Sequence, residues 1–291
     1  MLDPRRLRVL REVAVHGGIT HAAEALRVSP ASVSQQISRL ERDVGVTLLE
    51  KVGRGVGLTR AARGLVDQAE RIIAILEEAQ SELQAAKSLT TATVRIASFQ
   101  TFAAGVLPLM VHTMSHDHPG IDIVFSQREP DVAVSELLAR RVDLVVADEY
   151  PGISRLPEQG IIRKELGVEA VEVHLGSPDT GPAEAMWALE PEGTDARVFA
   201  EQACRAAGFE PRVGFESPDP SLHRQLVDFG VAAAFLPSTV ARGTSENTRV
   251  TGLFPQGLSR RLVVLLRRGT ERNPALQITL SAVERAAHQV L

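Results

Sequence analysis

Apolar side chains near the N-terminus recur at helical spacing in two short segments, residues 20–28 and 29–40. The apolar positions of the two segments are Ala22, Ala23, Leu26, Val33, Ile37 and Leu40. Positions three or four residues apart share one face of a helix, so the pattern predicts two short amphipathic helices. We expect Thr20 to cap the first helix and Ser29 to cap the second, with Pro30 in its first turn, where the missing amide hydrogen has no helical partner.

The second segment carries an unusual set of polar side chains on its outward face. These residues are Ser32, Ser34, Gln35, Gln36, Ser38 and Arg39. A glutamine amide can pair with the edge of adenine in two places, and a serine hydroxyl can donate or accept a hydrogen bond, so this face suits the edges of DNA bases. An ordinary helical hairpin with a solvated polar face has the same spacing, and the two helices alone leave that alternative open.

A glycine-rich segment follows, in which Gly53, Gly55 and Gly57 alternate with other residues. The basic residues around it are Lys51, Arg54 and Arg60. A hairpin there would carry guanidinium groups to the phosphate backbone or into a minor groove. Residues 1–60 contain 10 Lys and Arg against 6 Asp and Glu, whereas the whole chain has 32 against 36. Positive charge therefore gathers where the predicted DNA reader lies.

A long helix with a heptad pattern is predicted after the glycine-rich segment. Its apolar and small residues are spaced alternately by three and four positions, at Leu65, Ala69, Ile72, Leu76, Ala79, Leu83 and Ala86. This spacing is typical of a coiled coil, and we expect the helix to pair with a second copy of the chain. A homodimer would present two readers to an interrupted palindrome in double-stranded DNA. The alternative is an amphipathic helix that packs on its own domain.

From about residue 91 onward, short apolar runs of strand type alternate with helical stretches. The strand-like runs are residues 94–97, 121–125, 144–147, 170–175, 232–236 and 262–266. The helical stretches between them include residues 134–140, 196–207 and 220–228. Alternation of this kind predicts an α/β fold with mostly parallel sheets.

Ligands of such sheets bind beyond the carboxyl ends of the strands, where following helices present free amides. That rule selects Ser98, Phe99, Gln100, Thr101, Ser126, Gln127, Asp148, Thr194, Glu216 and Ser217. Hydroxyls and amides at capped helix starts can hold a carboxylate, so we expect a small polar or anionic effector. Helix capping alone would explain the same residue types. Residues 61–291 carry 22 Lys and Arg against 30 Asp and Glu, which discourages this part from touching DNA.

Residues 1–87 resemble the N-terminal part of LysR-type transcriptional regulators. The resemblance lies in AAEAL, SPASVSQQISRLERDVGVTLLEK and GRGVGLT. It implies a winged helix-turn-helix in residues 1–58, whose recognition helix spans residues 29–39, and a dimerisation linker helix in residues 59–88. The DNA contacts that the resemblance implies are Thr20, Ser29, Pro30, Ala31, Ser34, Gln35, Arg39 and Arg54. Gln35 stands where many members have arginine, a departure that bears on which base pairs are recognised.

The resemblance continues in VRIASFQTFAAGVLP, HPGIDIVFS, ELLARRVDLVVAD and FGVAAAFLP. It implies a two-lobed effector domain in residues 91–291, similar to periplasmic binding proteins. Lobe I would comprise residues 91–162 and 267–291, and lobe II residues 163–266, with an inducer bound between them. Arg141 and Ala232 replace two glycines that are usual in these motifs. Dimers of this family commonly pair into a homotetramer.

Other chemistry has weaker support in the chain. His112, His116 and His118 lack a cysteine or a carboxylate pair that would complete a metal site, so we expect neither metal nor cofactor. Cys204 is the single cysteine and has no resolving thiol, which favours a core position over redox sensing. Trp187 could line the ligand site, and packing in the second lobe is favoured.

The function predicted from these features is a sequence-specific transcriptional regulator controlled by a small molecule, with RNA polymerase as a possible partner. Two alternatives remain open: an architectural DNA-binding protein whose C-terminal domain binds no ligand, and an enzyme fused to a DNA-binding head. A nucleophile elbow, a phosphate loop and a dinucleotide fingerprint are all missing from the sequence, so we expect no enzyme. A run of about 18 apolar residues is also missing, and we expect a cytoplasmic protein that does not enter a membrane.

Overall fold

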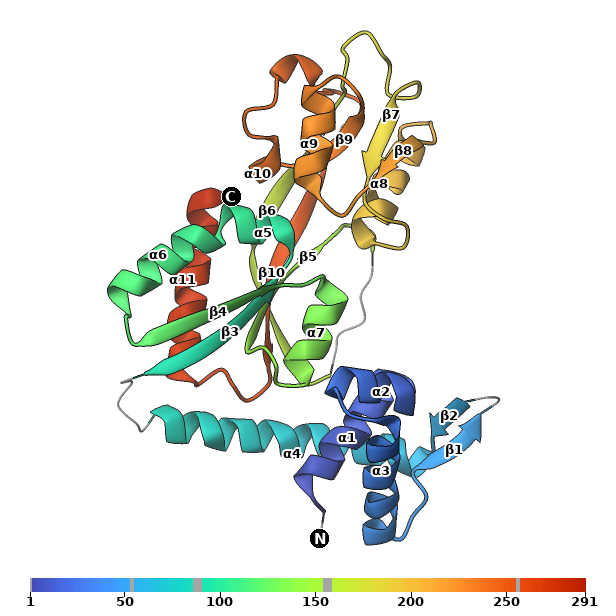
Figure 1. Ribbon diagram of the computed structural model, residues 1–291, viewed down its shortest axis with the longest axis vertical. Coiled ribbons are helices and arrows are strands. Elements are labelled where there is room, and N and C mark those ends of the chain that lie inside the picture. Colours follow the sequence, from blue (N-terminus) through green and yellow to red (C-terminus); the bar gives the residue numbers. More distant parts are fainter. Residues whose placement is uncertain (1, 53–54, 86–90, 154–158, 255–256) are drawn as a thin grey trace.

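The computed structural model describes residues 2–52, 55–85, 91–153, 159–254 and 257–291. A small helical domain and one long helix, α4, lie beneath a taller α/β part made of two lobes (Figure 1). The elements of the N-terminal part are α1 (Pro4–Val15), α2 (Ile19–Leu26), α3 (Pro30–Val44), β1 (Leu49–Val52), β2 (Gly55–Leu58) and α4 (Arg60–Ala85).

The N-terminal domain has the hydrophobic core that the sequence pattern predicts. Val33, Ile37 and Leu40 of α3 are buried among residues of α1, α2 and α4. Capping of α3 by Ser29 is confirmed, because its Oγ accepts a hydrogen bond from the backbone N of Ser32 at 3.2 Å.

The prediction that Thr20 caps the first helix is wrong. Helix α2 begins at Ile19, its N-cap is Gly18, and Thr20 lies inside the first turn on the surface. Ile19 packs against the domain core, so the helix starts one residue earlier than the polar pattern suggests.

Strands β1 and β2 form an antiparallel hairpin, the wing. A Cβ atom on Gly57 would lie 2.7 Å from Cγ2 of Val52, so glycine allows the two strands to approach closely at that position. Arg54 lies outside the described residues, as do Gly53 and the last residue of the predicted heptad pattern, Ala86.

One eight-stranded mixed sheet runs through both lobes in the order β4-β3-β5-β10-β6-β9-β7-β8. Its strands are β3 (Ala92–Ser98), β4 (Ile121–Gln127), β5 (Leu144–Glu149), β6 (Ile161–His174), β7 (Met186–Leu189), β8 (Arg212–Glu216), β9 (Ala233–Pro237) and β10 (Ser259–Arg267). Within each lobe the outer strands are parallel, which confirms the α/β fold. Strands β6 and β10 run antiparallel to their neighbours and connect the lobes.

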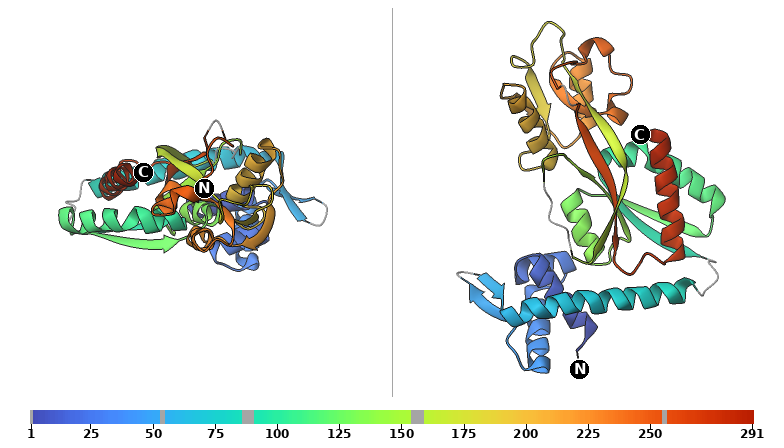
Figure 2. Two further views of the ribbon diagram at one scale, coloured as in Figure 1. Left: turned by 90° about the horizontal axis from the view of Figure 1, so that it is seen from above. Right: turned by 180° about the vertical axis from the view of Figure 1, so that it is seen from behind.

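The helices of the effector part cover the sheet on both faces. They are α5 (Gln100–Gly105), α6 (Leu107–Asp117), α7 (Pro130–Leu138), α8 (Asp195–Ala206), α9 (Pro220–Asp228), α10 (Ser238–Ala241), the short 3-10 helix η1 (Glu246–Thr248) and α11 (Pro274–Val290). In lobe I, α6 and α11 bury one face of the sheet and α7 buries the other. Figure 2 shows α4 passing along the base of this lobe, next to the lower end of α11.

The two connecting strands shift the lobe limits away from those that the sequence predicts. Strand β6 pairs with β10 up to Ala170 and with β9 from Val171 onward. Strand β10 pairs with β5 along Arg261–Leu266, so it belongs mostly to lobe I. The predicted limits at 163 and 267 fall inside β6 and at the end of β10, because each of these strands continues from one lobe into the other without interruption.

The core of lobe II accounts for two of the residues with alternative roles. Trp187 is fully buried there and its Nε1 donates to the carbonyl oxygen of Pro182 at 3.0 Å, which confirms its packing role. Cys204 is buried in the same core, and burial raises the pKa of its thiol to about 12. A thiol with that pKa is almost entirely protonated at neutral pH, which disfavours attack on an oxidant.

Within the described ranges, every helix is too short or too polar to cross a membrane.

Candidate DNA-reading face, effector cleft and interdomain junction

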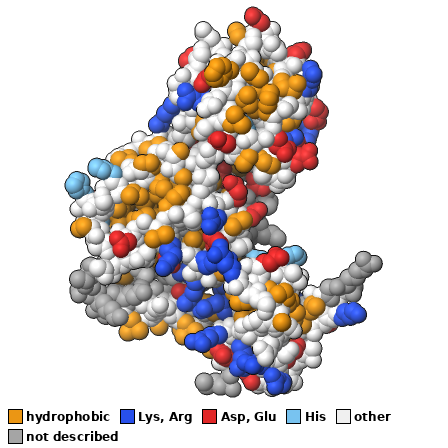
Figure 3. Space-filling view, viewed as in Figure 1, with side chains coloured by type: hydrophobic (Ala, Val, Ile, Leu, Met, Phe, Trp, Pro, Cys, Tyr) orange, Lys and Arg blue, Asp and Glu red, His pale blue; other side chains and the backbone are white. Residues whose placement is uncertain are grey.

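The outward face of α3 is free to meet DNA. Ser29, Pro30, Ala31, Ser34, Gln35 and Arg39 are all exposed. The buried stripe fixes this orientation, because the residues between its members must point to solvent. Lys51, on the wing, is also exposed, and Figure 3 shows blue Lys and Arg side chains over the N-terminal domain. The structure thus gathers the predicted contacts, Arg54 excepted, on one domain.

The heptad residues of helix α4 fall into two groups, one packed on the N-terminal domain and one exposed to solvent. Leu65, Ala69 and Ile72 pack on the core of the N-terminal domain, and Ala69 is fully buried there. Ala69 is therefore not available to a second chain. In the second half of the helix, Leu76, Ala79 and Leu83 are exposed, and the two leucines have exposures of 42% and 68%.

Ile75, which the heptad pattern does not include, is 64% exposed beside them. The alternative of packing on the helix's own domain thus holds for its first half only. The exposed residues Ile75, Leu76, Ala79 and Leu83 are called the α4 seam below.

A cavity of about 140 Å³ lies between the lobes. Five predicted residues line it, namely Phe99, Gln100, Thr101, Asp148 and Thr194. Ser98, Ser126, Gln127, Glu216 and Ser217 do not. Strands β4 and β8, which carry or precede four of these five, are the two outermost strands of the sheet, far from the strands around the cavity. Ser98 is buried, with its hydroxyl donating to the carbonyl of Phe99 at 3.3 Å.

Arg260 is the central side chain of the cleft, and the sequence analysis missed it. It lies near the start of β10 and is 3% exposed. Its Nη1 lies 3.1 Å from Asp148, and its Nε and Nη2 lie 2.9 and 2.7 Å from one oxygen of Glu169. Nη2 also donates to Thr101 Oγ1 at 2.5 Å, and the guanidinium lies 5.0 Å from the centre of the Phe99 ring.

Two further carboxylates of the cleft, Glu129 and Glu190, were also missed. Burial, with the nearby charges of Glu129 and Asp148, raises the pKa of Glu190 to about 7. Burial and the charge of Asp148 likewise raise the pKa of Glu129. Figure 3 shows red carboxylates around the hollow between the lobes. Glutamates in turns carry no periodic signal, so the sequence offered no means of finding them.

One hydrogen bond joins the lobes across the cleft. Nε2 of Gln100, in the first turn of α5, donates to Oδ1 of Asp219 at 2.6 Å. Asp219 is the N-cap of α9 in lobe II. The predicted residue Gln100 thus contacts the opposite lobe directly, which ties the state of the cleft to the spacing of the lobes.

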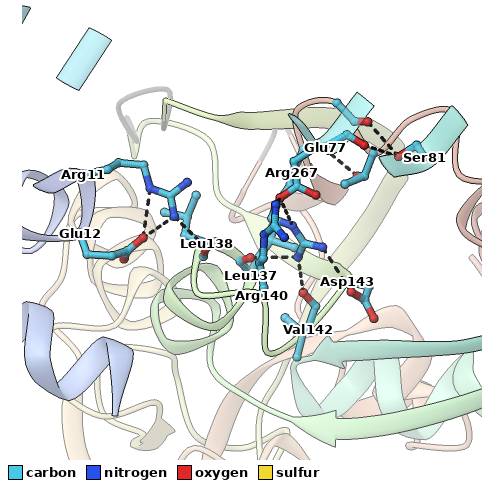
Figure 4. Close-up of polar contacts among 12 residues, drawn as sticks. Arg11, Glu12, Glu77, Ser81, Leu137, Leu138, Arg140, Val142, Asp143 and Arg267 are labelled. Atoms are coloured by element: carbon cyan, nitrogen blue, oxygen red, sulfur yellow. Dashed lines mark hydrogen bonds and ion pairs between the residues drawn. The ribbon is translucent and has the colours of Figure 1, made fainter. Parts of the chain in front are cut away.

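A second polar cluster, the interdomain junction, joins the N-terminal domain to lobe I (Figure 4). Arg11 of α1 forms an ion pair with its neighbour Glu12 and donates to the carbonyl of Leu138 at 2.8 Å. Arg27, at the end of α2, lies 3.1 Å from Glu136 of α7. These contacts attach the helices of the reader to the end of one helix of lobe I.

Glu77 of α4 is the centre of the other half of the junction. It is buried, forms an ion pair with Arg140 and lies 3.6 Å from Nε of Arg267. Arg267 also donates to the carbonyls of Leu137 and Val142 at 3.0 and 2.6 Å (Figure 4). One carboxylate of the linker helix is therefore held by two arginines of lobe I.

Left-handed backbone occurs at two of the junction arginines. Arg27 has φ of +55° and Arg140 has φ of +61°, and they are the only non-glycine residues with positive φ in the described part of the chain. Such a conformation costs free energy in a residue with a Cβ atom, so the surrounding contacts must stabilise it. Arg141, which replaces a usual glycine of the motif, directly follows Arg140.

An exposed reading helix with a wing, a long helix and a two-lobed α/β part with a ligand-sized cleft define a DNA-binding protein that responds to a small molecule. Two family models match this chain. Residues 4–63 match the bacterial regulatory helix-turn-helix protein of the lysR family, and residues 87–287 match the LysR substrate binding domain. The second match spans more than half of the chain. The chain belongs to the LysR family of transcriptional regulators, with a DNA-binding helix-turn-helix and an effector-binding domain.

Relatives over the full length agree with this assignment. The chain is 27% identical to the RuBisCO operon transcriptional regulator of Allochromatium vinosum, covering 93% of this chain and 92% of that one. It is 28% identical to a probable hydrogen peroxide-inducible genes activator of Streptomyces viridosporus, covering 97% and 93%. These relatives are named as regulators, and the protein is a regulator rather than an enzyme.

Solved structures show the same fold. A full-length OxyR variant from Pseudomonas aeruginosa superposes with a TM-score of 0.58 at 20% identity, over 97% of this chain and 95% of that one. The LysR family regulator CbnR superposes with a TM-score of 0.52 at 24% identity, over 97% and 100%.

Proposed function

We propose that this regulator acts in the cytoplasm, where a homodimer, paired further into a homotetramer, places two α3 helices on the halves of an interrupted palindrome. The exposed polar face of α3 carries the proposal, since Pro30, Ala31, Ser34 and Gln35 are short or amide side chains that a base edge can approach. Thr20, Arg39 and Arg54 are proposed to contact the DNA backbone or minor groove, and binding beside a promoter would bring RNA polymerase within reach.

Control by the effector follows from the two polar clusters. A ligand between the lobes changes the contacts of Arg260 and Gln100, and strand β10 continues from Arg260 to Arg267 at the junction. A change in lobe spacing would then alter the angle of α4 and the separation of the two readers. This is allostery with two nameable sites and one connecting element.

Selection of genomic fragments by the purified protein, followed by sequencing, tests the DNA part of the proposal. We expect recovery of a short interrupted palindrome. Gln35→Ala should reduce discrimination between base pairs by about 1 to 3 kcal/mol, because it removes a bidentate base contact. Gln277→Ala, which removes an exposed amide from α11, should leave the selected sequence unchanged. An unchanged preference in Gln35→Ala would refute the assigned face of α3.

The proposed interface of the dimer is the α4 seam. Leu76→Asp places a charge in an apolar interface and should convert dimers to monomers in analytical ultracentrifugation. Because Leu76 is exposed in the single chain, its fold should be retained. Arg71→Asp, an exposed position on the same helix outside the seam, serves as the control. Unchanged mass in Leu76→Asp would place the interface elsewhere.

A further inference from the structure

The described residues that line the effector cleft carry a large surplus of negative charge. Five carboxylates line the cavity, against a single cationic side chain, Arg260. The carboxylates are Glu129, Asp131, Asp148, Glu190 and Asp195. An anion that entered this cavity would meet repulsion unless Arg260 could receive it.

Arg260 is already neutralised by the chain itself. Its guanidinium contacts Asp148 and Glu169 at 2.7 to 3.1 Å, and it also contacts the Thr101 hydroxyl and the Phe99 ring. Glu169 is almost fully buried, so an incoming anion that displaced it would leave a buried charge without its cation, even though Thr239 still donates to the carboxylate. Breaking a buried ion pair in this way costs several kcal/mol. Arg260 therefore stabilises the cleft and is not a free anion receptor.

Three helix starts around the cleft, those of α7, α8 and α9, are also occupied by acidic groups of the chain, whereas the short helix α5 begins after Phe99 without a side-chain cap. Asp219 caps α9 and accepts from the backbone N of Ser221 at 2.9 Å. Asp131 lies in the first turn of α7, and Asp195 in the first turn of α8. The positive ends of α7, α8 and α9 thus face carboxylates of the chain before any ligand binds.

Glu190 is the side chain that a ligand could complement. It lines both the cleft and a smaller cavity of about 30 Å³ behind it, which Tyr150 and Phe199 also line. Among the described residues, no side chain forms a hydrogen bond or an ion pair with its carboxylate. The raised pKa of Glu190 has the same origin, because burial and neighbouring carboxylates disfavour its charged form. A positive group beside it would remove that penalty.

We infer that the effector of this regulator is a small organic cation, an amine, amidine or guanidine, whose charged group pairs with Glu190 between the lobes. This inference rests on the proposed role of the cleft as the effector site. In the part of the chain that the structure describes, no group of three His, Cys, Asp or Glu side chains is arranged to hold a metal ion, so an organic cation fits better than a metal. Phe99 and Tyr150 supply aromatic surface for its remainder. The sequence predicts a polar or anionic effector, and the folded cleft favours a polar one of positive charge.

Benzamidine and benzoate test the inference, because they share size and planar shape and differ in the sign of their charge. Full-length protein is titrated with each compound, with sodium chloride as the salt control, and the melting temperature and the heat of binding are measured. Benzamidine should raise the melting temperature by mass action, and benzoate should not. The affinity of the protein for benzamidine should rise about tenfold between pH 6 and pH 8, because Glu190 ionises over this range.

Glu190→Gln should lower the benzamidine affinity at least about tenfold at pH 8 and abolish its pH dependence. Glu216→Gln, an exposed carboxylate on the outermost strand, should change neither. The inference is overturned if benzoate binds and benzamidine does not, if neither binds, or if Glu190→Gln binds benzamidine as the parent does. If the DNA selection recovers a specific palindrome alongside any of these results, the inference of a cationic effector is refuted and the proposed function as a DNA-binding regulator stands. If benzamidine binds as expected but no palindrome is recovered, the proposed recognition of DNA is refuted and the cationic ligand of the cleft stands.

Discussion

Arg260 and Arg267 lie seven residues apart on strand β10, and each is a buried arginine between carboxylates. Arg260 contacts side chains of the effector part only, around a cavity. Arg267 is held by two backbone carbonyls and extends to Glu77 on the linker helix. At about 3.3 Å per residue the strand spans roughly 20 to 25 Å between them. One extended strand in the middle of the sheet thus connects the effector cleft with the helix that carries the reader.

The two sites differ in how their charges are balanced. In the cleft, several carboxylates surround one arginine, which leaves Glu190 unpaired among the described residues. At the junction, one carboxylate is shared by two arginines, with Asp143 lying 3.3 Å from Arg267 on the other side. The cleft thus leaves Glu190 open to a positive ligand, whereas at the junction Glu77 is already paired with arginines of lobe I and joins the linker helix to that lobe.

Removing Arg260 should have the largest effect. Arg260→Met leaves Asp148 and the buried Glu169 without their cation, and should lower the free energy of unfolding by about 3 to 5 kcal/mol. Unfolding in denaturant measures this loss of stability. Arg261→Met changes the next residue of the strand, whose side chain is half exposed and 3.9 Å from Glu165, and should cost less than about 1 kcal/mol. Equal losses in the two variants would contradict the central role of Arg260.

Removing the charge of Glu77 should lower the free energy of unfolding by an intermediate amount and should also loosen the contact between the domains. Glu77→Gln leaves Arg140 and Arg267 facing each other and should cost about 2 to 3 kcal/mol. Hydrogen exchange should increase in α4 and at the end of α7 and remain unchanged around the cleft. Glu78→Gln changes the neighbouring, half-exposed residue, which pairs with Arg272 at 3.3 Å, and is the matched control. If the backbone amides at the junction exchange no faster in Glu77→Gln than in the parent, apolar packing alone holds the domains together.

The smallest effect expected is a pH dependence that arises in the cleft. The pKa of Glu190 rises from an ordinary 4.5 to about 7, so the folded state holds this proton more tightly than the unfolded chain. Stability is therefore lost as the pH rises from about 4.5 through about 7. Relative to Glu190→Gln, the parent should lose about 1 to 3 kcal/mol between pH 5 and pH 8. Unfolding curves of both proteins at the two pH values measure this loss, and a constant difference between them would contradict it.

Local signals in the sequence determined the N-terminal domain and most strands of the large sheet. The stripe of Val33, Ile37 and Leu40 fixes which face of α3 is exposed, and Ser29 with Pro30 fixes where that helix starts. The apolar runs after residue 91 located six of the eight strands of the large sheet, and helix α9 has the predicted bounds. Each of these features depends on residues within a few positions of one another, so spacing and capping chemistry are sufficient to predict it.

Only the tertiary structure decided which polar residues form the cleft. Five of the ten predicted residues lie around the cavity, because strand order places the ends of β4 and β8 at the two edges of the sheet. Arg260 lies 91 positions from Glu169 in the sequence, and Arg267 lies 190 positions from Glu77. Contacts of such separation depend on chain topology, and no local periodicity records them. The same folding buries the first half of the α4 heptads against α1 and leaves the second half exposed, a division that the repeat itself does not contain.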